Sequence, residues 1–444
     1  MKTIKSTIQI SILSTLTFLS FNISGQVPVI KTPQPANMPT VPTCTNPANN
    51  YPATPNYPTP NPNNPLDDYE QDRRTIQRRD KEVNKILQEY NRNSHGIQFD
   101  FPSQANQTGT ENFRKSAKLL NDMLSGKVPA NLRDAVFSVE NAYFEGKLEY
   151  PKYTKAIQNL IMTAKLKAQQ DGYNWNNPLT RNVMLFRVMS DTLKIKQPSN
   201  ETTITSYPLR YDFDDFMGKN EWSKMFVSKL LSTKTGQCHS MPLLYLIMCE
   251  ATNTEANIAY SPMHSYIKFK DTNNEWHNLE LTNGHIVSDA YVIGSGFISS
   301  EALKNRIYMQ PQTKKQILQE CLTDLVAGYV FKYGYDEFAK QNISNILKNE
   351  PNYLQALLIK SNYETARFAY VAKQLGRPPL DSIKARYPRA YKLYEERNRT
   401  YQQIDDLGYR DMPADAYQDW LKSMDNEYQK QQQEKLTRQI QITK

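Results

Sequence analysis

Hydrophobic residues recur at helical spacing through most of the first half of the chain. In the stretch 66–93, apolar side chains return every three, four or seven residues and charged side chains fill the positions between them, which is the pattern of an amphipathic helix. The same periodicity, interrupted by Gly, Pro and Asn, predicts further helices at 111–127, 130–147, 151–170 and 178–193. The region 66–202 is therefore predicted to be helical, and it contains no recognisable catalytic group of residues.

The pattern changes between residues 203 and 310. Residues 221–251, EWSKMFVSKLLSTKTGQCHSMPLLYLIMCEA, indicate helix, turn and helix, and the second helix is apolar on all sides, as expected of a buried helix. The segments AYSPMHSYIKFK at 259–270 and EWHNLEL at 275–281 are rich in β-branched and aromatic residues, and the polar DTNN between them is typical of a turn. This region is predicted to hold a buried helix followed by an antiparallel hairpin.

Helical periodicity returns after Pro311. Two helices are predicted on either side of NEPN at 349–352, and their apolar positions lie roughly where a tetratricopeptide (TPR) unit places its packing residues: Phe338, Ala339, Ile346, Leu347, Pro351, Ala356 and Leu357. A degenerate second unit follows at 387–409. Because stable arrays need three or more repeats, the region 311–444 is interpreted as a helical, TPR-like cap that offers a surface to a protein partner. The predicted fold class is α+β, with a core at 203–310 between two helical regions.

Two segments precede the first predicted helix. Residues 1–25 combine two lysines, a short apolar stretch and small residues at Ser24 and Gly25, which is the form of a secretory signal peptide. The apolar stretch is too weak to span a bilayer, so no integral membrane span is expected in the mature chain. Residues 26–65 hold twelve of the 26 prolines and are predicted to form an extended, disordered tether. The protein is expected to be exported, to a periplasm or to the medium.

Charge and cysteine content narrow the possible partners. The 444 residues carry a formal charge of +9 but no dense basic block with interleaved aromatic residues, so nucleic acid is not expected as a partner. Four scattered cysteines are too few for the disulfide framework of an exported scaffold. Cys249 and Cys321 are predicted to be small buried apolar side chains, and Cys44 lies in the tether.

Cys238 stands out because of its position. It follows the turn Thr-Gly-Gln and opens the buried helix, and Gly236 is expected to let the backbone bend sharply before it. At a helix N-terminus the dipole and the unpaired N–H groups favour a thiolate, and the same N–H groups can stabilise an oxyanion. Cys238 is therefore the candidate nucleophile.

The predicted hairpin supplies candidates for the rest of a catalytic triad. His264 lies on its first strand, and Trp276, Asn278 and Glu280 share one face of its second strand because side chains alternate along a strand. If that face meets His264, either Glu280 or Asn278 can hydrogen-bond the imidazole. A thiol, a base and a group that holds the tautomer of the base are the parts that nucleophilic catalysis requires.

Neighbouring residues have supporting roles in this interpretation. His239 is adjacent to Cys238 but points about 100° away from it on a helix, so it is expected to line the cleft. Gln237 is a candidate oxyanion donor, and Trp276 and Asn278 are possible supports. Since no His, Cys and acidic residues have metal-ligand spacing along the chain, neither a metal nor another cofactor is expected.

The segments TGQCHSMPLLYLIMCEA, SPMHSYIKF and EWHNLELTNG, in that order, resemble the core of the transglutaminase-like superfamily. The resemblance covers the region 203–310 and implies a papain-like fold, with Cys238 at the start of a helix and His264 and the acid on successive strands. In that family a Trp stands four residues before the acid, as Trp276 stands before Glu280, although the usual acid is Asp. The implied roles are nucleophile for Cys238, base for His264 and orienting acid for Glu280.

The resemblance also implies a function. We expect an exported thiol enzyme that acts on amide bonds of a peptide or protein, by hydrolysis rather than cross-linking, since no second site for an amine is apparent. The alternative is a non-catalytic interaction or scaffold protein of the cell envelope, in which the helical regions bind a partner and the transglutaminase-like core serves as a binding module.

Overall fold

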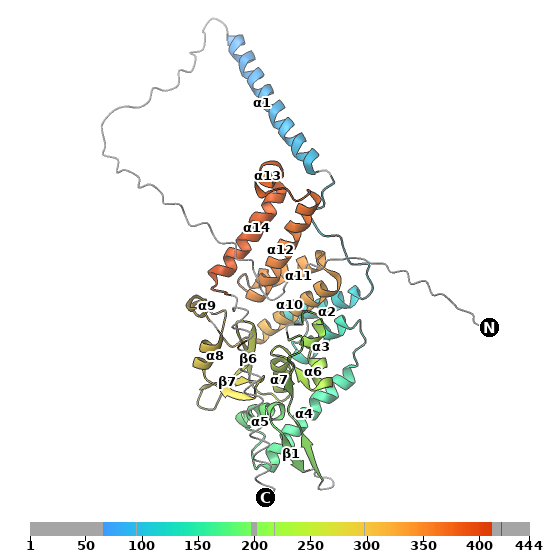
Figure 1. Cartoon of the computed structure of the whole chain (residues 1–444), viewed down its shortest axis with the longest axis vertical. Coiled ribbons are helices and arrows are strands. Elements are labelled where there is room, and N and C mark those ends of the chain that lie inside the picture. The colour runs from blue at the N-terminus through green and yellow to red at the C-terminus, as the bar shows by residue number, and fades with distance from the viewer. Residues whose placement is uncertain are drawn as a thin grey trace, which may run out of the picture. The chain divides into compact units, whose positions relative to one another are not determined.

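The computed structural model describes residues 65–410, except 95, 197–201, 217 and 297, and also Asp419. The predicted signal peptide, the predicted tether up to residue 64 with Cys44, and most of the chain after 410 lie outside the described residues. The described chain has an α+β fold and divides into two compact units (Figure 1). The larger unit contains residues 103–363 and those from 400 onward, and the smaller unit contains the described residues up to 102 and 364–399.

Helices make up most of both units. The helices of the larger unit are α2 (Thr110–Leu124), α3 (Leu132–Tyr143), α4 (Tyr150–Gln170), α5 (Pro178–Ser190), the short 3-10 helix η1 (Trp222–Met225), α6 (Val227–Thr233), α7 (Ser240–Ala251), α8 (Asp289–Gly296), α9 (Ser300–Lys304), α10 (Lys314–Tyr333) and α11 (Glu337–Asn349). The smaller unit contains α1 (Pro65–Ser94) and α13 (Leu380–Arg386), and the boundary between the units falls within α12 (Leu354–Gln374) and α14 (Pro388–Asp406). None of the described helices is long and apolar enough to cross a membrane.

The four helices predicted between 111 and 193 are present as α2 to α5, but the last prediction ran too far. α5 ends at Ser190, and the chain continues as strand β1 (Leu193–Lys196), which pairs antiparallel with β2 (Thr203–Ser206). Along β1 the buried Leu193 and Ile195 alternate with exposed lysines. This period of two is the signature of a strand with one buried face, and it overrides the helical pattern upstream.

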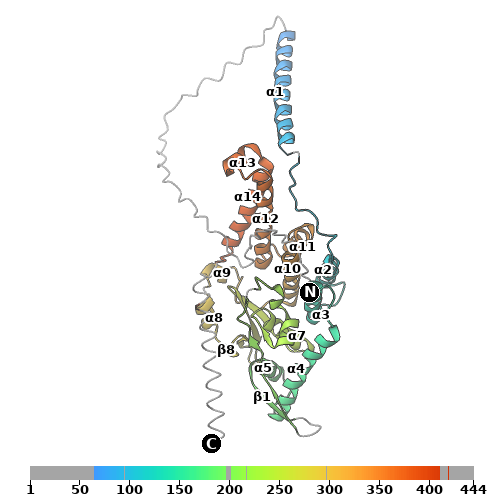
Figure 2. The same ribbon diagram turned by 45° about the vertical axis from the view of Figure 1, so that its right-hand side comes forward.

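Helix α7 lies at the centre of the larger unit. Its residues from Ser240 to Cys249 are all buried, and α3, α4, α5 and α6 pack on it together with strands β5 and β6 (Figure 1, Figure 2). The continuous apolar run of the sequence explains this placement, because a helix that is apolar on all sides must be enclosed on all sides. The predictions of a buried helix here and of a buried Cys249 are confirmed, and Cys321 is buried as well.

The sheet beside α7 is a four-stranded antiparallel meander of β5 (Asn257–Ser261), β6 (His264–Lys270), β7 (Trp276–Glu280) and β8 (His285–Val287). The predicted hairpin is present as β6 and β7, whereas the predicted first strand, 259–270, is in fact two strands. Pro262 and Met263 form a tight turn between them, and Met263 has a φ of 56°, the left-handed value that such a turn requires at its second central residue. A shorter pair, β3 (Arg210–Tyr211) and β4 (Thr235–Gly236), is parallel.

The region 203–310 packs closely with helices on both sides of it in the sequence. Helices α3 to α5 contact α7 directly, and α10 packs on α2 and α3. The compact unit of residues 103–363 therefore contains the region 203–310 together with helices from both sides of it in the sequence. The apolar surface of α7 accounts for the contacts with α3 to α5, and α10 joins the unit through its packing on α2 and α3.

The smaller unit has its own core. Residues from the segment around residue 99 and from α12, α13 and α14 pack together in it: Phe99, Val371, Ile383, Ala390 and Leu393. The Arg367 side chain donates to the Phe99 carbonyl at 2.7 Å and pairs with Asp100 at 2.9 Å. These contacts join the segment around residue 100 to the second half of α12.

A buried carboxylate caps the start of α6. The residue before α6, Phe226, has no side chain that could accept a hydrogen bond, and Glu140 of α3 accepts from the N–H groups of Val227 and Ser228 at 2.6 and 2.8 Å instead. Burial raises the pKa of Glu140 to about 7, although both hydrogen bonds favour the charged form. Since α6 leads directly to β4 and Cys238, this contact between α3 and α6 supports the segment that carries the candidate nucleophile.

Removing the Glu140 carboxylate is expected to destabilise the protein. The variant Glu140→Ala leaves two buried N–H groups of α6 without an acceptor, at a cost of about 1–3 kcal/mol in the free energy of unfolding, measured by chemical denaturation. The control is Glu149→Ala, at an exposed residue at the start of the neighbouring α4, with an expected change within about 0.5 kcal/mol. Equal stabilities of the two variants would contradict this role.

Candidate functional site

Cys238 lies in the short connection between β4 and α7. The Ser240 hydroxyl accepts from the Gln237 N–H at 3.1 Å, and the Gln237 carbonyl accepts from the Met241 N–H at 3.0 Å. At Gly236 a Cβ would approach the Ser240 Oγ to 2.7 Å and the Leu230 Cδ1 to 2.8 Å. Glycine is therefore needed at 236 because of close packing, and not for the backbone bend that the sequence analysis assigned to it, since φ at Gly236 is not positive.

The start of strand β6 is held against this connection. The Ser265 hydroxyl donates to the Cys238 carbonyl, and the Cys238 Sγ lies 3.9 Å from the Met263 carbonyl oxygen. The turn at Pro262 and Met263 therefore places His264 beside the N-terminal end of α7. The side chain of Cys238 is mostly enclosed, with 9% of the residue exposed.

His264 and Glu280 form a buried ion pair on adjacent strands. The register that pairs Ile267 with Leu279 places both residues on the same face of the sheet, two positions apart along the strands. The His264 Nε2 and the Glu280 Oε2 are 2.6 Å apart, and their side chains are only 8% and 6% exposed. Glu280 Oε1 accepts from the Thr282 N–H at 3.1 Å and from its hydroxyl at 2.6 Å. Both carboxylate oxygens therefore have partners, and the longer side chain of Glu reaches the imidazole.

The electrostatics of the pair favour an imidazolium. Burial disfavours the charged ring, but the charge of Glu280 and hydrogen bonding with the Cys238 and Glu280 side chains outweigh it and raise the pKa of His264 to about 10. Burial likewise opposes the charge of Glu280, yet His264 and Thr282 keep its pKa below the usual value. The three side chains thus form a chain of contacts in the order Cys238, His264, Glu280.

Three of the four predicted supporting residues are engaged elsewhere. The Asn278 amide donates to Asp289 at 2.8 Å, so Glu280 and not Asn278 contacts His264. Trp276 is 43% exposed, and its ring lies under the ammonium groups of Lys268 and Lys270. The side-chain amide of Gln237 donates to a backbone carbonyl, that of Asp215, at 3.3 Å.

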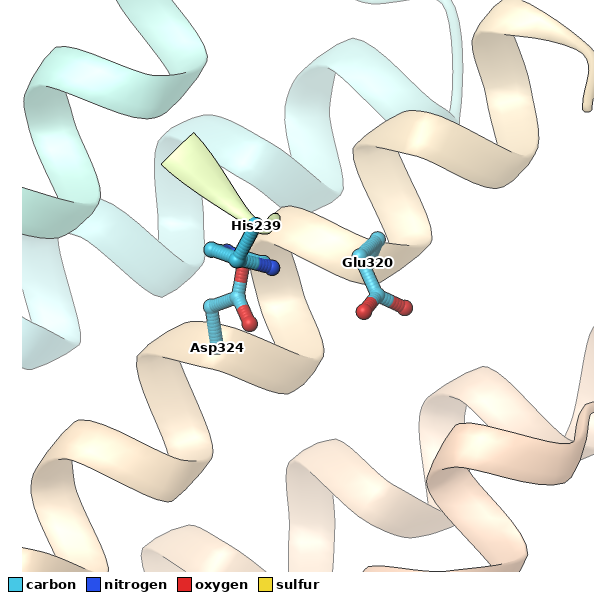
Figure 3. Close-up of side chains that lie close together, drawn as sticks. All are labelled: His239, Glu320 and Asp324. Atoms are coloured by element: carbon cyan, nitrogen blue, oxygen red, sulfur yellow. The ribbon is translucent and has the colours of Figure 1, made fainter. Parts of the chain in front are cut away.

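His239, the fourth supporting residue, contacts α10 instead of His264 or Glu280. Its Nε2 lies 3.0 Å from the Asp324 Oδ2 of α10, and Glu320 stands one turn away on the same helix (Figure 3). Burial disfavours its charged form, but the two carboxylates raise the pKa of His239 to about 9. Glu320 and Asp324 were not predicted as partners of His239 because they lie about eighty residues further along the chain, far beyond the short spacing of a ligand motif. The available signal was a pair of acids one helical turn apart in the mostly apolar α10.

No protein-family profile matches this chain. No curated protein and no solved structure matches it either. The transglutaminase-like resemblance therefore stays a prediction, and function has to be argued from the geometry of Cys238, His264 and Glu280.

Neutralising Glu280 is expected to lower the pKa of His264. In Glu280→Gln the imidazolium loses its carboxylate partner, so its pKa falls from about 10 toward the ordinary 6.5, measured by NMR titration of the histidine side chains. The matched control is Asp271→Asn, which neutralises the carboxylate of a second pair in the same sheet, with His277, and leaves the pKa of His264 unchanged. An unaltered His264 titration in Glu280→Gln would refute the assigned pairing.

The raised pKa of His264 also predicts how stability depends on pH. Because the folded chain holds this proton more tightly than the unfolded chain, the contribution is complete below pH 6.5 and is lost as pH rises to about 10. The difference in free energy of unfolding between wild type and His264→Gln should therefore shrink by a few kcal/mol across this range. His239 titrates in both proteins, so its contribution cancels in the difference between their free energies of unfolding. A difference that is constant from pH 6.5 to 10 would contradict the prediction.

Proposed function

We propose that this protein is a thiol hydrolase of amide bonds with a papain- or transglutaminase-like core. The observation that supports it is the ordered contact of Cys238, His264 and Glu280, in which a thiol before a buried helix meets an imidazole that is held by a carboxylate. A nucleophile, a proton carrier and an orienting group in this order are the parts required for acyl transfer through a covalent intermediate.

The first half of the proposed reaction breaks the amide. The Cys238 sulfur, as a thiolate, forms a bond to the carbonyl carbon, and the carbonyl oxygen takes the negative charge near the N-terminus of α7, where backbone N–H groups stabilise it. The imidazolium of His264 then gives its proton to the amide nitrogen. The carbon–nitrogen bond breaks, the amine leaves, and an acyl group remains on sulfur.

The second half restores the enzyme. His264, now neutral, takes a proton from a water molecule as the water oxygen bonds to the acyl carbon. The carbon–sulfur bond breaks, the carboxylic acid leaves, and the thiolate and imidazolium are regenerated. Throughout, Glu280 keeps the ring oriented, and Thr282 keeps Glu280 in place through two hydrogen bonds. In this proposal the extra methylene of Glu, relative to the family's usual Asp, is accommodated by this anchoring.

The substrate class in this proposal follows from the sequence. The N-terminal segment with the form of a signal peptide supports action outside the cytoplasm, and in this proposal peptides or proteins of the envelope or the medium supply the amide bonds. Hydrolysis is favoured over cross-linking, because water can serve as the acceptor and no site for an amine is apparent among the residues that the structure describes.

A non-catalytic interaction module is the second candidate. The observation that favours it is the burial of the site, since Cys238 is 9% exposed and the His264 side chain 8%. A substrate reaches these atoms only if the residues around them move. In this alternative Cys238, His264 and Glu280 form a buried polar contact that only stabilises the fold, and the helical regions bind a partner.

Replacing the thiol distinguishes the two candidates. Against a library of peptides and envelope proteins, the enzyme hypothesis predicts hydrolysis that falls at least about 10³-fold in Cys238→Ala and about 10²- to 10⁴-fold in Glu280→Gln. Cys249→Ala, at the buried far end of the same helix, is the control and retains activity. Iodoacetamide is expected to label Cys238 faster than glutathione under the same conditions. Labelling no faster than glutathione, with no difference between wild type and Cys238→Ala, would support the interaction module.

A further inference from the structure

A stripe along α10 brings together groups that the proposed reaction does not use. Glu320, Asp324 and Gly328 follow one another at intervals of four residues and so lie on one side of the helix. His239 faces this stripe from the start of α7 (Figure 3), and the ligand atoms of His239, Glu320 and Asp324 all lie within 4.8 Å of one another. The three side chains come from segments about eighty residues apart, and all are buried or half-buried.

The cluster is held in place by its surroundings. Asp324 is 3.0 Å from the His239 Nε2, and the Tyr353 hydroxyl donates to the Glu320 Oε2 at 2.5 Å. Asp324 thus contacts the imidazole directly, and Tyr353 fixes the Glu320 carboxylate nearby on the same helix. Preorganised ligands on secondary structure are what a metal site requires.

A small cavity adjoins the cluster. It has a volume of about 20 Å³, enough for one water molecule, and both His239 and Asp324 line it. Trp222 also lines this cavity; the residue is nine-tenths buried, and its indole N–H is buried without a hydrogen-bond partner among the described residues. Gly328 makes room for the indole ring of Trp222, because a Cβ at residue 328 would lie 3.1 Å from the Trp222 Nε1. A buried donor without a partner at a water-sized cavity points to a bound polar species.

The charges around the cavity favour a cation. Among the described residues that line it, Glu140 and Asp324 are acidic and His239 is the only base; Glu320 adds a third carboxylate. Buried acids in excess over bases leave negative charge that a cation would compensate.

The geometry points to a site for one divalent transition-metal ion, bound by His239, Glu320 and Asp324, with a water molecule in the adjoining cavity as fourth ligand. Imidazole nitrogen and carboxylate oxygen suit Zn²⁺ in a tetrahedral site, where ligand atoms stand roughly 3.3 Å apart. The ligand atoms are at most 4.8 Å apart, and binding would require side-chain rotations that bring them to this value. The Trp222 N–H would donate to the water ligand. The ion would tie the start of α7 to α10, and its binding does not depend on Cys238 being catalytic.

The test is direct binding of Zn²⁺ to the full chain. After treatment with a chelator and dialysis, isothermal titration is expected to show one Zn²⁺ per chain, with affinity reduced at least tenfold in both Asp324→Asn and Glu320→Gln. Asp271→Asn, in the His277 pair of the sheet, is the matched control and leaves the affinity unchanged. Cys238→Ala also retains the affinity, which separates this site from a thiol and imidazole acting as ligands at the triad.

Several outcomes would overturn the proposal. The wild-type chain could fail to bind Zn²⁺, either carboxylate variant could keep its full affinity, or Cys238→Ala could lose binding; each of these results would contradict the proposed site. Circular dichroism checks that each variant folds, and if Asp324→Asn does not fold, Glu320→Gln decides. The Co²⁺ complex of the wild-type chain gives an answer without any variant: a visible spectrum of nitrogen and oxygen ligands is expected, and a thiolate-to-cobalt band at the stoichiometric ion would overturn the assignment.

Discussion

The enclosure of one apolar helix organises the larger unit. Because α7 has no polar face, helices from before it and a sheet from after it must all pack against it. Its buried surface explains the packing of α3 to α5 on the region 203–310, and α2 and α10 join the same unit by packing on α3. Polar side chains lie at the N-terminal end of α7, because the apolar run begins there and the first backbone N–H groups of the helix still need hydrogen-bond acceptors.

Two imidazoles lie at the N-terminal end of α7 and pair with different elements. His264, at the start of β6, is paired with Glu280 of β7, and His239, beside Cys238 in the sequence, is paired with Asp324 of α10. In each pair the carboxylate compensates the desolvation of the ring, so that the pKa of both histidines is raised. Through these two contacts the segment that carries Cys238 is held both beside the sheet and beside α10.

Much of the local structure was predictable because it depends on periodicity. The spacing of apolar residues located α2 to α5 and α7, and strand alternation placed Glu280 on one face of β7. The turn at Pro262 and Met263 was missed, because both flanking segments have strand composition and a left-handed Met has no distinct sequence signal. The end of α5 was missed because the four residues of β1 are too few to outweigh the helical pattern before them.

The sequence by itself determined which side chains could meet within one hairpin or one helix. His264 and Glu280 are sixteen residues apart on adjacent strands, and one turn and the alternation of strands bring them together. Tertiary structure alone decided which of Glu280 and Asn278 contacts the imidazole, since both lie on the same face. It also decided the partner of His239, because Glu320 and Asp324 are about eighty residues away, and only the packing of helices around α7 brings α10 to this histidine. Periodicity records the orientation of a side chain on its own element, but not which distant element will cover it.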